Sequence, residues 1–341
     1  MATNKAAFLA LAGLAAVTLV FAAGRVDPNN PTGSHGLIVI DKIGRHVRFF
    51  DPASFQEISN LNVGVAPHDV AISPDHKFAY IPVYGDGVYG KNPHPGHTIA
   101  IIDLATRQLA GDIDVSPYQA PHGIQIDDAG TIYVTCDLSR KLLVINPKAR
   151  AIEAAIDTEG TGHWSAVLPD ASKAYVANKN DKLYISVIDL KKRSIVARIP
   201  APNGTQGITA SPDGKFVVAV DLVEPKLIVI DPATDTVEVM LPLEGNTKGS
   251  FKPRFSPDGS KLLVANMTES LVNVIDTADP HGKQNVIPVG KDPMGFAFAP
   301  DGKTVLVANH GDGTVSVVDL SQNRVVSTFK GGSGVESLAY Y

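Results

Sequence analysis

The stretch that decides the fold runs Ser256-Pro-Asp-Gly259, then Leu262-Leu-Val-Ala-Asn266, then Val272-Asn-Val-Ile-Asp276. Pro-Asp-Gly favours a tight turn because proline presets φ, aspartate accepts backbone hydrogen bonds and glycine tolerates positive φ. The two runs that follow are short, rich in apolar and β-branched residues and bounded by polar ones, which is typical of strands. The stretch therefore predicts consecutive strands of an antiparallel sheet.

The same phrase recurs along the chain. The third residue of its turn falls at positions 75, 129, 170, 213, 258 and 301, so the spacings are 54, 41, 43, 45 and 43 residues. Four short strands per unit of about 43 residues are typical of β-propeller blades. The longer first spacing contains an insertion, Tyr84–His97, of the kind that acts as a lid or specificity loop over a binding face.

The two ends of the chain give the blade count. Six complete units run from Pro67 to Gly334, and three strand-like runs precede them at Leu37–Asp41, Val47–Asp51 and Glu57–Val63. One further run, Val335–Tyr341, follows them. One C-terminal strand and three N-terminal strands would complete another blade and leave no exposed sheet edge. The sequence therefore predicts an all-β, seven-bladed β-propeller over residues 36–341.

The first residues have a different character. Residues 1–23 carry one cation, Lys5, followed by an uncharged apolar run that ends in small residues, which predicts a secretory signal peptide. An uncleaved N-terminal anchor is the alternative, because the apolar run is close to the length of a membrane span. Residues 24–35 are then a linker. Both interpretations place the propeller outside the cytoplasm, periplasmic or secreted, with membrane attachment only if the segment is retained.

Composition excludes several classes of function. The chain has 341 residues and balances 30 Lys and Arg against 35 Asp and Glu, for a net charge of −5. It has no basic field to attract nucleic acid, so no nucleic-acid partner is expected. The one cysteine, Cys136, excludes an internal disulfide and any paired-cysteine zinc or redox motif. We expect a monomer that binds a small molecule or a protein ligand.

The repeat phrases resemble those of a known family. Tyr175-Val-Ala-Asn178, the Ser-Pro-Asp-Gly turns and the Val-Ile-Asp runs are similar to those of the YVTN-repeat propellers, which include secreted YncE-like proteins. The resemblance covers residues 36–341 and extends distantly to the cytochrome d1-type and lactonase-type propellers. It implies the fold but little about activity, because the shared motifs are turns and strands.

The candidate site comes from positions that differ between blades. Aligning the blades on the turn places one residue of each at the entrance to the innermost strand, in the order Glu336, His68, His122, His163, Gln206, Phe251 and Met294. Three imidazoles and a carboxylate at the channel mouth predict a site for Zn, Cu or Fe formed by His68, His122, His163 and Glu336. The alternative is that these histidines are hydrogen-bonded wall residues with no bound ion.

Other residues on this face are candidates for holding a cofactor or another ligand. They are Trp164, Gln206, Arg254 and His310. Trp164 would stack on a ligand or else pack between blades, and Cys136 would be a soft metal ligand or else a small buried hydrophobic residue.

Two classes of function stay open at this point. One is a periplasmic or secreted binding protein with a histidine-rich channel mouth that takes a metal, a cofactor or a partner. The other is an enzyme, either a metal-dependent hydrolase or lyase similar to the lactonase-type propellers or a redox enzyme. His68 and His122 each follow a proline, as in lactonase-type propellers, but the remaining polar residues of that type are not recognisable in this sequence.

Overall fold

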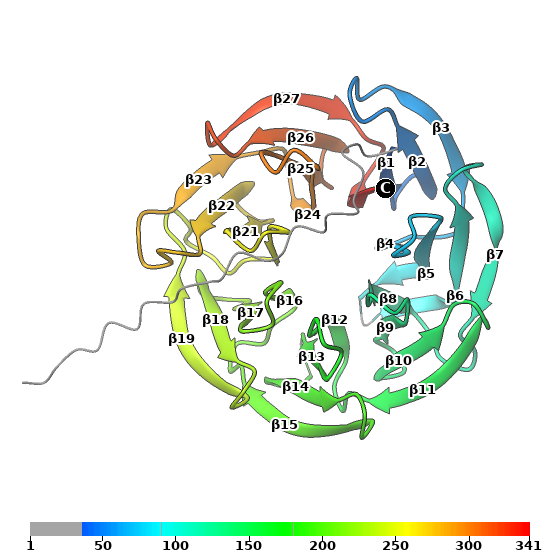
Figure 1. Ribbon diagram of the computed structural model, residues 1–341, viewed down its shortest axis with the longest axis horizontal. Helices are drawn as coiled ribbons and strands as arrows, with labels where there is room; N and C mark the ends of the chain where they lie inside the picture. The colour runs from blue at the N-terminus through cyan, green and yellow to red at the C-terminus, as the bar shows by residue number, and fades with distance from the viewer. Residues whose placement is uncertain (1–35, 90, 180) are drawn as a thin grey trace, which may run out of the picture.

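Seven four-stranded sheets make up the computed structural model, which describes residues 36–89, 91–179 and 181–341. They surround a central axis as the blades of a β-propeller, with one strand of each sheet innermost and one at the rim (Figure 1). The predicted seven-bladed, all-β fold is confirmed. Within the described ranges, no helix is long and apolar enough to cross a membrane. The predicted signal peptide or anchor at 1–23 and the linker at 24–35 lie outside the described residues.

The blades follow one another along the chain, and each contains an inner, a second, a third and an outer strand. In that order, blade by blade, the strands are β4 (Ala71–Ile72), β5 (Phe78–Val88), β6 (Lys91–Asp103) and β7 (Gln108–Asp114); β8 (Pro121–Ile126), β9 (Ile132–Cys136), β10 (Lys141–Asn146) and β11 (Ala151–Asp157); β12 (Gly162–Val167), β13 (Lys173–Asn178), β14 (Tyr184–Asp189) and β15 (Ser194–Pro200); β16 (Ile208–Ala210), β17 (Val217–Val220), β18 (Lys226–Asp231) and β19 (Thr236–Pro242); β20 (Lys252–Phe255), β21 (Lys261–Asn266), β22 (Leu271–Asp276) and β23 (Asn285–Pro288); β24 (Pro293–Phe298), β25 (Thr304–Asn309), β26 (Thr314–Asp319) and β27 (Arg324–Lys330); and β28 (Val335–Tyr340), β1 (Leu37–Asp41), β2 (His46–Phe50) and β3 (Glu57–Asn62).

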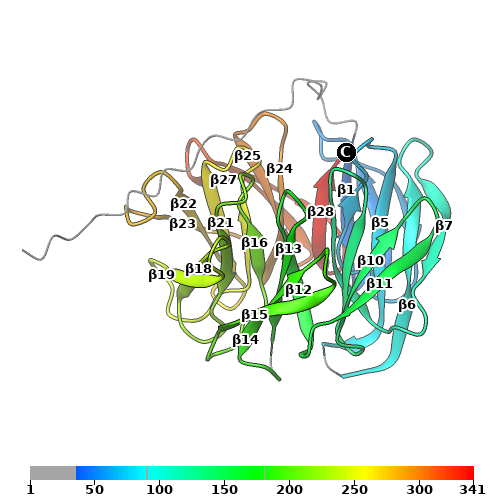
Figure 2. The same cartoon turned by 60° about the horizontal axis from the view of Figure 1, so that its bottom comes forward.

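The last of these blades closes the ring. The C-terminal strand β28 pairs antiparallel with β1, with Leu37 opposite Tyr340 and Val39 opposite Leu338. Figure 2 shows the two strands side by side. The predicted closure by one C-terminal and three N-terminal strands is confirmed.

The recurring turns join the inner strand of a blade to the second strand. The hydroxyl of Ser211 donates to the Asp213 carboxylate at 2.7 Å, and Gly214 follows with a φ of 71°. His76 and Ala171 stand at the place of this glycine and adopt φ values of 55° and 51°. The hairpin thus imposes a left-handed conformation at this position, which glycine meets with the least strain.

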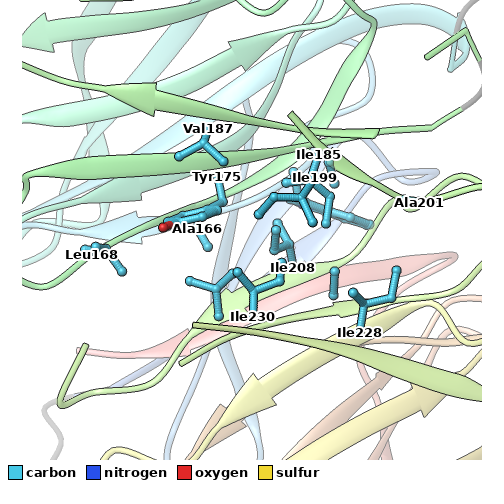
Figure 3. Packing of buried hydrophobic residues seen from close by; sticks show 14 of the residues in the cluster. Ala166, Leu168, Tyr175, Ile185, Val187, Ile199, Ala201, Ile208, Ile228 and Ile230 are labelled. Atoms are coloured by element: carbon cyan, nitrogen blue, oxygen red, sulfur yellow. The ribbon is translucent and has the colours of Figure 1, made fainter. Parts of the chain in front are cut away.

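The core lies between neighbouring blades rather than at the axis. Tyr175 and Ile185 of one blade pack with Ile208 and Ile228 of the next, and all four side chains are buried (Figure 3). Strands between two such layers are apolar on both faces. For this reason the second and third strands read as nearly continuous apolar runs.

Closure of the ring leads to a first prediction. Deleting residues 335–341 would remove the inner strand of the closing blade and expose a sheet edge, so we expect aggregation or loss of cooperative thermal unfolding. The point variant Leu338→Asp would bury a carboxylate in the same strand and should cost about 3 kcal/mol or more of unfolding free energy. Val326→Asp, on an exposed side chain of β27, is the matched control. A truncated protein that melts like the full chain would contradict the role of β28 in closure.

Candidate functional site

Three histidines from consecutive blades lie against one another. His122 belongs to β8, His163 to β12, and His68 precedes β4 by a short segment. The ring centres of His68 and His122 are 3.8 Å apart, and those of His122 and His163 are 4.1 Å apart. All three side chains are buried. We call this group, His68, His122 and His163, the histidine stack.

Hydrogen bonds fix the tautomers of two members of the stack. Nδ1 of His122 donates to the carbonyl oxygen of His163 at 3.1 Å, which leaves a lone pair on its Nε2. Lys42 Nζ donates to Nε2 of His68 at 3.0 Å, which leaves the proton of His68 on Nδ1. Among the described residues, Nδ1 of His68 and Nδ1 of His163 have no hydrogen-bond partner. The stack therefore retains hydrogen-bonding capacity that the protein does not use.

Burial keeps the imidazoles uncharged. It lowers the pKa of His68, His122 and His163 well below the usual value, and the positive charge of Lys42 acts in the same direction. At neutral pH each ring is consequently neutral and offers a nitrogen lone pair.

A buried carboxylate lies beside the stack. Oε1 of Glu336, on β28, is 3.5 Å from Nε2 of His68, and Oε2 is 3.4 Å from Lys42 Nζ and 3.1 Å from Nδ1 of His310. Burial alone would raise the pKa of this carboxyl group, but Lys42 and His310 outweigh it and lower the pKa to about 2. Glu336 is therefore an anion with a cation, Lys42, held against it.

Lys42 is a site residue that the sequence analysis did not predict. It is the first residue after β1, and the corresponding residue of each other blade lies on the same face of the propeller. These residues are Lys42, Tyr84, Asp137, Lys179, Asp221, Met267 and His310. Aligning the second strands residue by residue, as well as the starts of the innermost strands, would have found these positions; in β5 the strand continues beyond Tyr84 into the hairpin.

The insertion Tyr84–His97 covers the stack. It is not an irregular loop but an extension of the hairpin formed by β5 and β6, in which Asp86 pairs with His94. Near its tip the ring centre of Tyr89 lies 4.5 Å from that of His163, and the Tyr89 hydroxyl donates to the carbonyl oxygen of Thr161. The hairpin thus contributes to the burial of the stack, as a lid would.

The other predicted residues are distributed around the stack. The Trp164 ring contacts His163, with centres 4.2 Å apart, and Phe251, with centres 5.1 Å apart. Gln206 is buried just before β16, and no hydrogen bond or ring contact within the described ranges links it to the histidines. Cys136 is buried in an apolar cluster, and burial raises the pKa of its thiol, so it behaves as a small hydrophobic residue.

A channel of about 630 Å³ runs between the inner strands. Its lining begins at Asp69, Gly123 and Trp164, one residue beyond each histidine of the stack, and it also includes Arg254. The sequence predicted that the histidines surround an open channel mouth. In the structure they do not, because all three side chains are buried. They form a buried layer at one end of the channel, and Tyr89 of the β5–β6 hairpin packs against His122 and His163 there.

The stack does not have the geometry of a bound metal site. In the described part of the chain, no group of three or more His, Cys, Asp or Glu side chains is arranged to hold a metal ion. Two imidazoles on one zinc ion hold their ring centres roughly 5 Å apart. The rings of the stack are closer than this because they lie against one another rather than converging on a common point.

Comparisons with known proteins support the fold. No family model matches the sequence, and no curated protein matches it. Among solved structures, hydrazine synthase from Kuenenia stuttgartiensis is similar with a TM-score of 0.69 and 20% identity, over 80% of this chain and 89% of that one. A functionally unknown protein from Desulfotomaculum acetoxidans DSM 771 is similar with a TM-score of 0.71 and 14% identity, over 90% of this chain and 99% of that one. At such identities the similarity shows the fold alone.

The neutral stack leads to a prediction about pH. An unfolded histidine binds a proton below about pH 6.5, whereas the buried rings resist protonation, so the unfolding free energy should fall as the pH is lowered through this value. The fall is at most about 1.4 kcal/mol per pH unit for each ring. His122→Asn removes one such ring and should flatten this slope between pH 7.5 and 5, measured by urea unfolding with EDTA present.

His281→Gln is the matched control, because His281 is exposed. Its slope should equal that of the wild type. Equal slopes in His122→Asn and the wild type would mean that the stack takes up protons as readily as an unfolded chain.

Proposed function

We propose that this propeller is an extracytoplasmic binding protein and that the histidine stack and Glu336 take a transition-metal cation. The observation that carries the proposal is the position of Lys42. Its ammonium group lies 3.0 Å from Nε2 of His68 and 3.4 Å from the Glu336 carboxylate. A cation already occupies the space between an imidazole lone pair and a buried anion.

The donor types fit zinc, copper or iron. His68 Nε2 and Glu336 would supply two ligands, and the free Nε2 lone pair of His122 would supply a third. His163 and His310 are the neighbouring imidazoles. Binding would require Lys42 to leave and the stacked rings to turn about their side-chain torsions. The Lys42 side chain is 21% exposed, so it has access to solvent.

The packing around the histidine stack favours binding over catalysis. An enzyme similar to the lactonase-type propellers, or a redox enzyme, would need room for a substrate beside the same donors. The Tyr89 ring at the tip of the hairpin packs against His163, and its centre is 6.0 Å from that of His122. The resemblance of the repeats to the YVTN family is consistent with a binding role.

The competition between Lys42 and the metal leads to the next prediction. In untagged protein titrated with Zn²⁺ or Cu²⁺ at pH 7.5 and followed by calorimetry, Lys42→Met should bind the metal several-fold more tightly, because a competing cation is gone. His68→Ala and His122→Ala should each weaken binding by about tenfold or more, and their effects should not add, because both ligate one ion.

Lys303→Met, at an exposed lysine of a turn, is the matched control and should bind like the wild type. Unchanged binding in both histidine variants would exclude the stack as the metal site. The hairpin would then be the next place to look for function.

The compartment is a separate proposal with its own test. If residues 1–23 are a signal peptide, intact-mass analysis of protein from a periplasmic extract should show a chain that lacks them. If the segment is an anchor, the full-length chain should appear in the membrane fraction. Full-length chain in the cytoplasm would contradict both.

A further inference from the structure

The central channel carries charged groups that the proposed metal site does not use. Besides the inner strands, its lining includes turn residues from the face opposite the stack, among them Asp128, Pro169, Pro212 and Pro257. The channel therefore reaches that face. Its volume of about 630 Å³ lies within the range of small-molecule sites.

Two cations from one strand line this channel. Lys252 and Arg254 are two residues apart on β20, so their side chains point to the same side of the strand. Arg254 is exposed although it comes from an innermost strand, so its side chain reaches the water-accessible space. In the described ranges, no ion pair or hydrogen bond engages its guanidinium group.

Two neutral donors in the lining have no hydrogen-bond partner among the described residues. They are Nε1 of Trp164 and Oγ of Ser165, both buried and both on β12. An indole N–H can only donate. Lys252 Nζ lies 4.5 Å from the centre of the Trp164 ring, which links the two donor-bearing strands.

Two carboxylates of the channel, those of Asp69 and Asp127, are already engaged. Asp69 accepts hydrogen bonds from the Ser337 hydroxyl at 2.7 Å and from the Val70 amide at 3.0 Å. Its Oδ2 forms an ion pair with Lys252 Nζ at 3.7 Å, a distance too long for a direct hydrogen bond. Asp127 accepts from a backbone amide and a tyrosine hydroxyl of its own blade. Near Trp164 and Arg254 the lining thus has unused donors, while the exposed carboxylate of Asp128 lies in a turn at the opposite end of the channel.

We infer that the channel binds a small oxoanion, of the carboxylate or phosphate class, through Arg254 and Lys252. The guanidinium fork matches two oxygens of such a group, and Lys252 supplies a second positive charge. The Trp164 N–H and the Ser165 hydroxyl are neutral donors in the same lining. The site adjoins the proposed metal site but uses different residues, so the inference does not rest on metal binding.

The chain offers a built-in reporter for the test. Trp164 is its single tryptophan. Citrate and inorganic phosphate are titrated separately into the full protein at constant ionic strength with EDTA present, and binding is followed by tryptophan fluorescence and by calorimetry. We expect saturable binding of at least one of them. The anion that binds more tightly shows whether the channel prefers a carboxylate or a phosphate.

Variants assign the binding to the channel. Arg254→Gln should weaken it by about tenfold or more, and Arg254→Lys by less, since the charge remains but the fork is lost. Arg324→Gln, at an exposed arginine of β27, is the matched control and should bind like the wild type. Absence of saturable binding for both anions, or equal affinity in the wild type and both Arg254 variants, would overturn the inference. Because EDTA removes metal ions, failure in this test leaves the metal proposal unaffected.

Discussion

The pairing of β28 with β1 is the constraint on which the candidate site depends. It brings Glu336 from the C-terminal end of the chain beside Lys42 from the N-terminal end, with 3.4 Å between their charged atoms. The same seam is tied by Asp41, which accepts hydrogen bonds from the amides of Ser333 and Gly334 at 2.9 and 3.0 Å. The carboxylate and its cation therefore meet only in a closed ring.

The negative charge of Glu336 and the positive charge of Lys42 balance each other within the site. Glu336 is buried, which would be costly for an isolated carboxylate, and Lys42 and His310 offset that cost. With Lys42 in place, a further positive charge on His68 or His122 is unfavourable. Neutral rings beside a paired carboxylate follow from this balance.

The fold could be predicted from the sequence because its signals are local. Each Pro-Asp turn and each Val-Ile-Asp run marks its own strand, and the repeated spacing orders the blades. The same register brought His68, His122 and His163 to one place.

Lys42 and Tyr89 were not found this way. Lys42 required the register of the second strands as well, and Tyr89 depends on the path of a hairpin that has no counterpart in the other blades. Part of the burial of the histidines comes from that hairpin, so this part could not be predicted either.

The blade entrances also break the symmetry of the propeller. Four consecutive blades place Glu336, His68, His122 and His163 at equivalent positions, whereas other blades place Phe251 and Met294 there. With Gln206 in the next blade, five consecutive positions of the ring are polar, and the remaining two are apolar. A molecule bound against this layer would contact polar side chains on one side and apolar side chains on the other, although the backbone around it is nearly symmetric. It would settle away from the sevenfold axis, in one orientation rather than in seven equivalent ones.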